Sequence, residues 1–141
     1  MMQLKVITNN PQIRQLLRER QEDCQFIDAE EADAVLLAAQ QLIMAGWRLA
    51  ADPLQGYYTR YNPFHTVFLQ NGGDDSPDMQ ILRLQHSVEH LHSSRRPPIE
   101  KTPRIRADYQ ALDYSLACST MALLGDCPIY DEVNNCGNQK N

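Results

Sequence analysis

Short runs of β-branched and aromatic residues alternate along this chain with longer runs in which apolar residues recur at helical spacing. The first strand-like run is Leu4–Thr8, and others occupy residues 24–27, 47–50 and 64–69. Asn10-Pro11 begins the first helix-like run, because asparagine caps helices and proline suits the first helical position. Strands that alternate with helices predict an α/β fold. We therefore expect a small, mainly parallel sheet of about four strands with helices on both faces.

The helix-like runs have recognisable boundaries. Residues 33–43 carry an apolar stripe that ends at Gly46, and Ser76-Pro77 supplies the cap and first position of a helix expected to reach residue 94. A last helix is expected over residues 107–124. A chain of 141 residues suits one domain. We predict a single α/β domain over residues 1–125 and a flexible C-terminal tail over residues 126–141.

Charge, hydropathy and cysteine spacing limit the classes of partner. The net charge of −5 at pH 7 argues against a surface that binds nucleic acid mainly through phosphates. No apolar run approaches the roughly 18 residues of a membrane span, and the start does not read as a signal peptide. A cytoplasmic protein with no nucleic-acid or membrane partner is expected. The cysteines contain no C-x-x-C pair, so we expect reduced thiols and no cofactor.

Two polar loops follow predicted strands. The first is Thr8-Asn9-Asn10-Pro11, and the second is Asp52-Pro53-Leu54-Gln55-Gly56. Ligands of open α/β sheets bind beyond the carboxyl ends of strands, often against a helix N-terminus whose N–H groups attract anions. If the first and third strands run parallel, both loops emerge at one edge of the sheet and form a pocket. Read singly, the loops are a capped helix start and an ordinary Pro/Gly turn.

A histidine motif offers a competing interpretation. His86, Glu89 and His90 fit H-x-x-E-H, the spacing of a family of zinc peptidases with an inverted motif. The apolar stripe of the expected helix consists of Ile81, Leu84, Val88 and Leu91. Both histidines fall nearly opposite this stripe, toward water. A catalytic zinc needs a third protein ligand in a sheltered cleft, and no spacing in the chain selects one. We therefore expect no metal site.

Three segments together resemble a known family. They are the strand ending in Thr8-Asn9-Asn10-Pro11, the loop Asp52-Pro53-Leu54-x-Gly56, and residues 108–116, which look like the family's last helix. The chain resembles the GrdX family, small proteins encoded alongside components of glycine, sarcosine and betaine reductase. The resemblance spans most of residues 2–124, and it departs at Asp52, where the family pattern has histidine. It implies association with amino-acid reduction but no particular reaction.

Two hypotheses follow. In the first, the chain is a non-catalytic accessory protein of glycine, sarcosine and betaine reductase metabolism. It would bind a reductase component or a small zwitterionic or anionic ligand. The amides opening the first helix would hold the carboxylate of such a ligand, and Asp52 its ammonium group. The candidate ligand-binding residues are Thr8, Asn9, Asn10, Asp52, Pro53, Gly56 and Asp113.

The alternative is a small enzyme. It would depend on the carboxylates Asp52 and Asp113, or on a metal held by the H-x-x-E-H helix. Asp113 is expected to be partly buried on the flank of an apolar helix face formed by Leu112, Leu116 and Leu123, where its protonation would be perturbed. The favoured interpretation of Asp113 is a buried capping or salt-bridging aspartate, with Arg48 or Arg104 as its partner. Neither Cys24 nor Cys118 has a neighbour in the sequence that would make it a reactive thiolate. The alternative therefore depends on carboxylates or on a metal.

Overall fold

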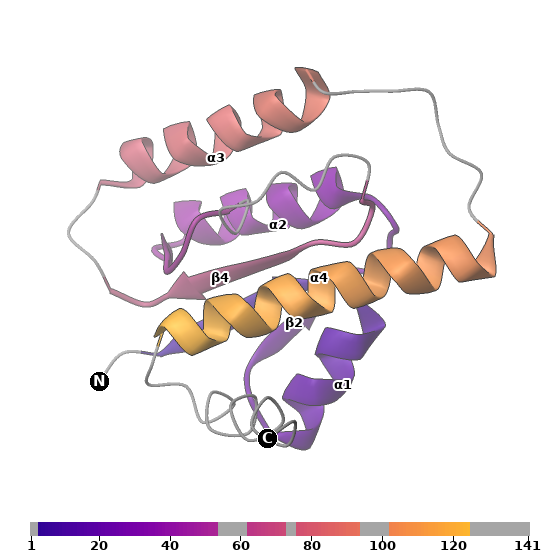
Figure 1. Ribbon diagram of the computed structural model, residues 1–141. Coiled ribbons are helices and arrows are strands. Elements are labelled where there is room, and N and C mark those ends of the chain that lie inside the picture. The colour runs from indigo at the N-terminus through magenta and orange to yellow at the C-terminus, as the bar shows by residue number, and fades with distance from the viewer. Residues whose placement is uncertain (1–2, 54–61, 73–75, 94–101, 125–141) are drawn as a thin grey trace.

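The computed structural model describes residues 3–53, 62–72, 76–93 and 102–124. Within them, four helices enclose a four-stranded sheet (Figure 1). Helices α2 (Ala32–Met44) and α3 (Pro77–Ser93) cover one face, and α1 (Pro11–Glu19) and α4 (Pro103–Leu124) cover the other. The predicted α/β fold with helices on both faces is confirmed.

The sheet is mixed, so the prediction of a mainly parallel sheet is wrong. Its strands, β1 (Leu4–Thr8), β2 (Cys24–Phe26), β3 (Arg48–Leu49) and β4 (Thr66–Gln70), lie in the order β2-β1-β4-β3. Among hydrogen-bonded neighbours only β1 and β2 are parallel, because β4 lies between β1 and β3 and runs antiparallel to both. Parallel neighbours need a long crossover, usually a helix. Pro53 and Pro63 stand between β3 and β4, and proline is unfavourable inside a helix.

The two faces of the sheet carry separate apolar clusters. Along β1, Ile7 packs with α2 and α3, whereas its neighbour Val6 packs with α1 and α4. The same alternation places Val67 on the first side and Phe68 on the second. All four side chains are at most 2% exposed. Each contributes about 1.5–3 kcal/mol by leaving water, so the strand register is firmly fixed.

The predicted helix boundaries mostly hold. The Asn10 side chain caps α1 by accepting a hydrogen bond from the Gln12 amide at 3.0 Å, and α2 ends before Gly46, whose φ is 117°. Ser76 caps α3 through the Met79 amide at 3.3 Å. Helix α4 begins at Pro103, before the predicted residue 107, because the Thr102 hydroxyl accepts from the Ile105 amide at 3.2 Å.

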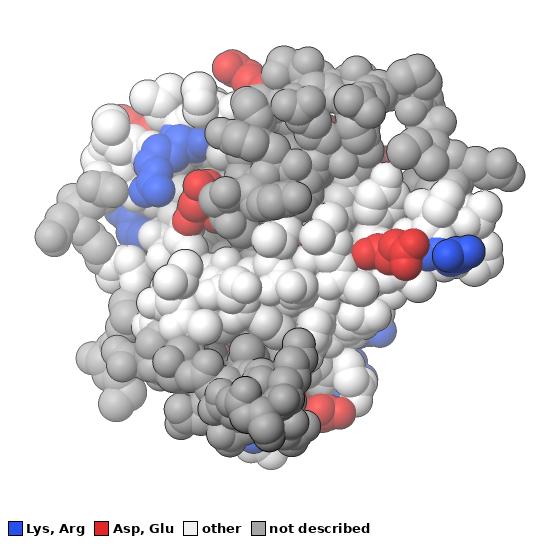
Figure 2. Space-filling view, in the orientation of Figure 1, with Lys and Arg blue, Asp and Glu red and all other residues white. Residues whose placement is uncertain are grey.

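Helix α4 buries a different face from the one predicted. Leu112 is 39% exposed and Leu123 is 87% exposed, so the leucine face does not pack on the sheet. The buried residues are Asp113, Ala117, Thr120 and Met121. They recur at helical spacing and form the stripe of α4 that faces the interior. Figure 2 shows that the described surface over the middle of α4 carries almost no charge.

Some predictions fall on other parts of the chain. Gly56 and the predicted tail, residues 126–141, lie outside the described residues. No helix within the described ranges has both the length and the apolar character needed to cross a bilayer.

Candidate functional site

The two polar loops reach the same edge of the sheet. Strands β1 and β3 both run antiparallel to β4, so they point in the same direction. The residues that follow β1 and those that follow β3 therefore arrive where β4 begins. This edge combines the carboxyl ends of two strands with the start of α1, a common place for ligands in α/β proteins.

His65 joins the two loops immediately before β4. Its backbone amide donates to Asn9 Oδ1 at 2.8 Å, and its ring nitrogen Nε2 lies 2.6 Å from the carbonyl oxygen of Pro53. A carbonyl only accepts, so Nε2 carries the proton and donates. Asn9 also donates through Nδ2 to the carbonyls of Pro63 at 2.7 Å and Ala29 at 2.8 Å. Asn9 and His65 are 3% and 2% exposed, so the bridge is an internal one.

A second set of buried hydrogen bonds lies beside this bridge. Thr66 Oγ1 donates to Asp113 Oδ2 at 2.8 Å, and the Thr8 and Thr66 hydroxyls are 2.8 Å apart. Because the single Thr66 proton goes to Asp113, the Thr8 hydroxyl proton is shared between two acceptors, Thr66 Oγ1 at 2.8 Å and the His65 carbonyl oxygen at 3.2 Å. Asn10 contributes twice, because its backbone amide donates to Thr8 Oγ1 and its Nδ2 donates to Asp113 Oδ2, both at 3.0 Å. Hydrogen bonds arranged in such a chain strengthen one another.

The predicted site residues thus fall into two groups. Thr8, Asn10 and Asp113 are at most 2% exposed, and with Thr66, which was not predicted, their side chains hold β1, β4, α1 and α4 together and do not face an open cleft. Ligand binding by Thr8, Asn10 and Asp113 remains a prediction. Asp52 is exposed and Pro53 is buried, and both line a pocket at the end of β3.

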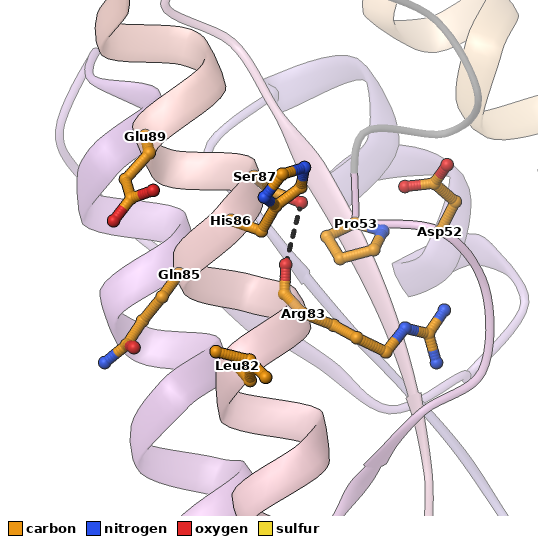
Figure 3. Close-up of a pocket in the computed structure, with 8 residues that line it drawn as sticks. All are labelled: Asp52, Pro53, Leu82, Arg83, Gln85, His86, Ser87 and Glu89. Atoms are coloured by element: carbon orange, nitrogen blue, oxygen red, sulfur yellow. Dashed lines mark hydrogen bonds between the residues drawn. The ribbon is translucent and has the colours of Figure 1, made fainter.

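That pocket, the α3 pocket, lies between the segment after β3 and helix α3 and has a volume of about 520 Å³. Its lining residues are Asp52, Pro53, Leu82, Arg83, Gln85, His86, Ser87 and Glu89. Figure 3 shows the side chain of Arg83 extending from α3 toward the segment that carries Asp52 and Pro53. The Ser87 hydroxyl donates to the Arg83 carbonyl at 3.2 Å, a bond within the helix.

The α3 pocket combines opposite charges with apolar surface. Asp52 supplies a carboxylate for a cationic group, and Arg83 supplies a planar guanidinium for a carboxylate. Pro53 and Leu82 add apolar contact, and His86 adds an imidazole. A small zwitterion presents complementary groups to such walls.

The histidine motif lies partly on this pocket. His86 is exposed, as predicted for its face of α3, and the side chain of His90 lies outside the described residues. Within the described ranges no three His, Cys, Asp or Glu residues are placed together to hold a metal ion.

The cysteines that the structure describes, Cys24 and Cys118, are not in disulfide bonds. Burial raises the pKa of the Cys24 thiol, and the nearby Asp23 carboxylate raises it further against the lowering effect of Arg14 and Arg18. The protonated thiol is a poor nucleophile at neutral pH.

Sequence reasoning missed His65, Thr66 and Arg83. The alternation of β4 contained a signal for Thr66, because a threonine among large apolar residues at a buried strand position needs a polar partner. His65 and Arg83 gave no such signal, since Asn9 and Pro53, which bond His65, and Asp52, which shares the pocket with Arg83, come from distant segments.

One comparison with known proteins gives a match. A family model described as GrdX-like protein matches residues 5–122. No curated protein and no solved structure matches the chain.

Proposed function

Because this chain belongs to the GrdX-like protein family, we propose that it is a non-catalytic accessory protein of glycine, sarcosine and betaine reductase metabolism. Its role in this proposal is to bind a small amino-acid-like zwitterion. We infer the ligand class from the presence of Asp52 and Arg83 in one pocket of about 520 Å³.

The charges of the α3 pocket support this ligand class. The ammonium or quaternary ammonium group of the ligand lies toward Asp52, and the ligand carboxylate accepts hydrogen bonds from Arg83. Asp52 is thus the ammonium partner expected from the sequence. Arg83 takes the place of the start of α1 as carboxylate partner, since the Asn10 side chain there is already bonded to Gln12, Gln110 and Asp113.

The described residues favour binding over catalysis. Asp113 accepts from Asn10 and Thr66 in the interior and is not among the residues lining the pocket of Asp52, so these carboxylates are not an acid–base pair there. Burial and Asp23 raise the pKa of Cys24, which keeps its thiol protonated. The Thr66 hydroxyl donates to Asp113, but both side chains are buried and neither lines the α3 pocket.

Titration calorimetry with glycine, sarcosine and betaine tests the proposal. At least one ligand binds the wild type, and Asp52→Asn and Arg83→Gln each weaken that binding by about tenfold, because each removes a charge-assisted contact. Arg18→Gln is the matched control, since Arg18 is exposed on α1 and does not line the α3 pocket. Equal affinity of Asp52→Asn, Arg83→Gln and the wild type would refute the site.

A second role, contact with a reductase component, has its own supporting observation. Leu37 and Met44 on α2 are 57% and 68% exposed, and Met79 and Leu82 on α3 are 54% and 59% exposed. Large apolar side chains exposed on adjacent helices are typical of protein-interaction surfaces. In a binding assay with purified reductase components, Leu37→Ser combined with Met44→Ser weakens the complex. Leu123→Ser, an equally polar change on the opposite layer, leaves the complex intact.

A further inference from the structure

A second pocket, the α1 pocket, lies at the carboxyl ends of the parallel strands β1 and β2 and has a volume of about 400 Å³. Asn9, which follows β1, and Asp28, which follows β2, both line it, together with Pro11 and Arg14 of α1. It is separate from the α3 pocket, and the two have no lining residue in common.

Arg14 dominates the chemistry of the α1 pocket. Its guanidinium carbon lies 4.0 Å from the centre of the Phe26 ring, so the flat cation is held against an aromatic face. No described residue accepts a hydrogen bond from this guanidinium, although the side chain is half-buried. Its N–H donors are therefore positioned and available to a ligand.

The other charges around Arg14 define what the pocket can accept. Arg106 donates through Nε to Glu30 Oε1 at 2.9 Å and through Nη2 to Glu30 Oε2 at 2.5 Å, so these two charges neutralise each other. Asp28 is exposed at the rim and opposes an anion there. The start of α1 adds the positive end of its helix dipole at Pro11, and this end favours an anion inside the pocket.

We propose that the α1 pocket binds a small oxyanion, a carboxylate or a phosphate, through the guanidinium of Arg14. The planar donors of arginine match either group bidentately. Phe26 fixes the orientation of the guanidinium, so less freedom is lost when the anion binds. This site goes beyond the zwitterion site of the α3 pocket and does not depend on it.

Calorimetric titration of the full chain with inorganic phosphate and with acetate, at constant ionic strength, tests the proposal. At least one anion binds the wild type, and Arg14→Gln weakens that binding about tenfold or more. Asp28→Asn strengthens it, because a like charge at the rim is removed. The anion that binds more tightly identifies the group for which the pocket is suited.

Arg18→Gln is the control, because Arg18 is one helical turn from Arg14, is exposed and does not line the pocket. Its affinity for the anion equals that of the wild type. Failure of both anions to bind the wild type, or equal weakening by Arg14→Gln and Arg18→Gln, would overturn the proposal. Asp52→Asn leaves anion binding unchanged, so loss of zwitterion binding at the α3 pocket and loss of anion binding here are told apart.

Discussion

The amide nitrogen Nδ2 of Asn10 lies 3.0 Å from Oδ2 of Asp113, although 103 positions separate the two residues in the chain. Both side chains are at most 2% exposed. The same Asn10 amide nitrogen also donates to the Gln110 carbonyl at 2.9 Å, so one residue binds the middle of α4 to the start of α1. Asn10 belongs to the loop that follows β1, so this contact fixes that loop against α4.

Removing the buried carboxylate tests how much the cluster stabilises the fold. Asp113→Ala deprives Asn10 Nδ2 and Thr66 Oγ1 of their acceptor, and a buried donor left unsatisfied costs about 1–3 kcal/mol. We expect the free energy of unfolding, measured in urea, to fall by about 3 kcal/mol. Asp108→Ala, an exposed change on the same helix, stays within about 0.5 kcal/mol of the wild type. Similar values for the two variants would contradict the role assigned to Asp113.

We expect the hydroxyl of Thr66 to contribute more to the free energy of unfolding than the volume of its side chain does. Thr66→Val keeps the volume but removes the donor to Asp113 and the acceptor for Thr8, so it lowers the free energy of unfolding by about 1–3 kcal/mol. Thr66→Ser keeps the hydroxyl and loses one methyl group, which costs about 0.8 kcal/mol. Denaturant titrations of both variants measure the difference, and a valine variant as stable as the serine variant would show that the hydroxyl chain contributes little.

Local signals in the sequence predicted most elements of the fold. The Asn10-Pro11 start of α1, the Gly46 end of α2 and the Ser76 cap of α3 depend on a few neighbouring residues, and all three are confirmed. The family resemblance is confirmed as well. Local patterns could not give the direction of β4, because a buried apolar run such as Val67-Phe68-Leu69 is compatible with a strand parallel or antiparallel to its neighbours.

The candidate site was predictable only in part. Sequence order placed Thr8–Asn10 and Asp52 after strands, and the structure brings these loops to one edge. The link between them is His65, which precedes the antiparallel β4. A parallel β4 would begin at the opposite edge of the sheet, so the expected topology does not bring His65 to these loops. The leucines of α4 predict the wrong buried face, because Asp113 is buried by hydrogen-bond partners far away in the chain, Asn10 and Thr66.

Substitution of His65 should disturb the edge of the sheet. His65→Phe fills similar space but cannot donate to the buried Pro53 carbonyl, and the unsatisfied acceptor costs about 1–3 kcal/mol of unfolding free energy. It also displaces Asp52, so affinity for a zwitterion falls in calorimetry. For comparison, His86→Ala stays within about 0.5 kcal/mol of wild-type stability, because the His86 side chain is exposed. Wild-type stability of the His65→Phe variant would show that the hydrogen bond from His65 to the Pro53 carbonyl does not stabilise the fold.

The pH dependence of Cys24 alkylation reports on the burial and the charges around this residue of β2. Its pKa is raised by burial first and by Asp23 second, so alkylation by iodoacetamide, followed at the Cys24 peptide by mass spectrometry, begins only above the pH at which an ordinary cysteine reacts. Asp23→Asn lowers the midpoint of this profile, and Arg18→Gln raises it, because Arg18 favours the thiolate. Shifts of the same sign in both variants would contradict the electrostatic origin.

The raised pKa of Cys24 also has a consequence for stability. The folded state holds the thiol proton more tightly than the unfolded chain does. The stability that depends on the protonated thiol is therefore fully present below the pKa of the unfolded thiol. It is lost as the pH rises through the higher pKa of the folded thiol. Cys24→Ser should therefore flatten the fall of the unfolding free energy on the alkaline side, as urea titrations at several pH values would measure.

The two roles of Asn10 can be separated by one substitution. Asn10→Asp keeps an oxygen that can accept from the Gln12 amide, so the cap of α1 survives. It replaces the donor to Asp113 by a second carboxyl group within hydrogen-bonding distance, and like charges at such a buried position repel strongly. We expect Asn10→Asp to lower the free energy of unfolding more than Asn10→Ala, although alanine also removes the cap. Thr102→Ala removes a cap alone and costs about 1 kcal/mol. If Asn10→Asp were instead more stable than Asn10→Ala in urea titrations, capping would be the main contribution of Asn10, and the contact with Asp113 would have little energetic weight.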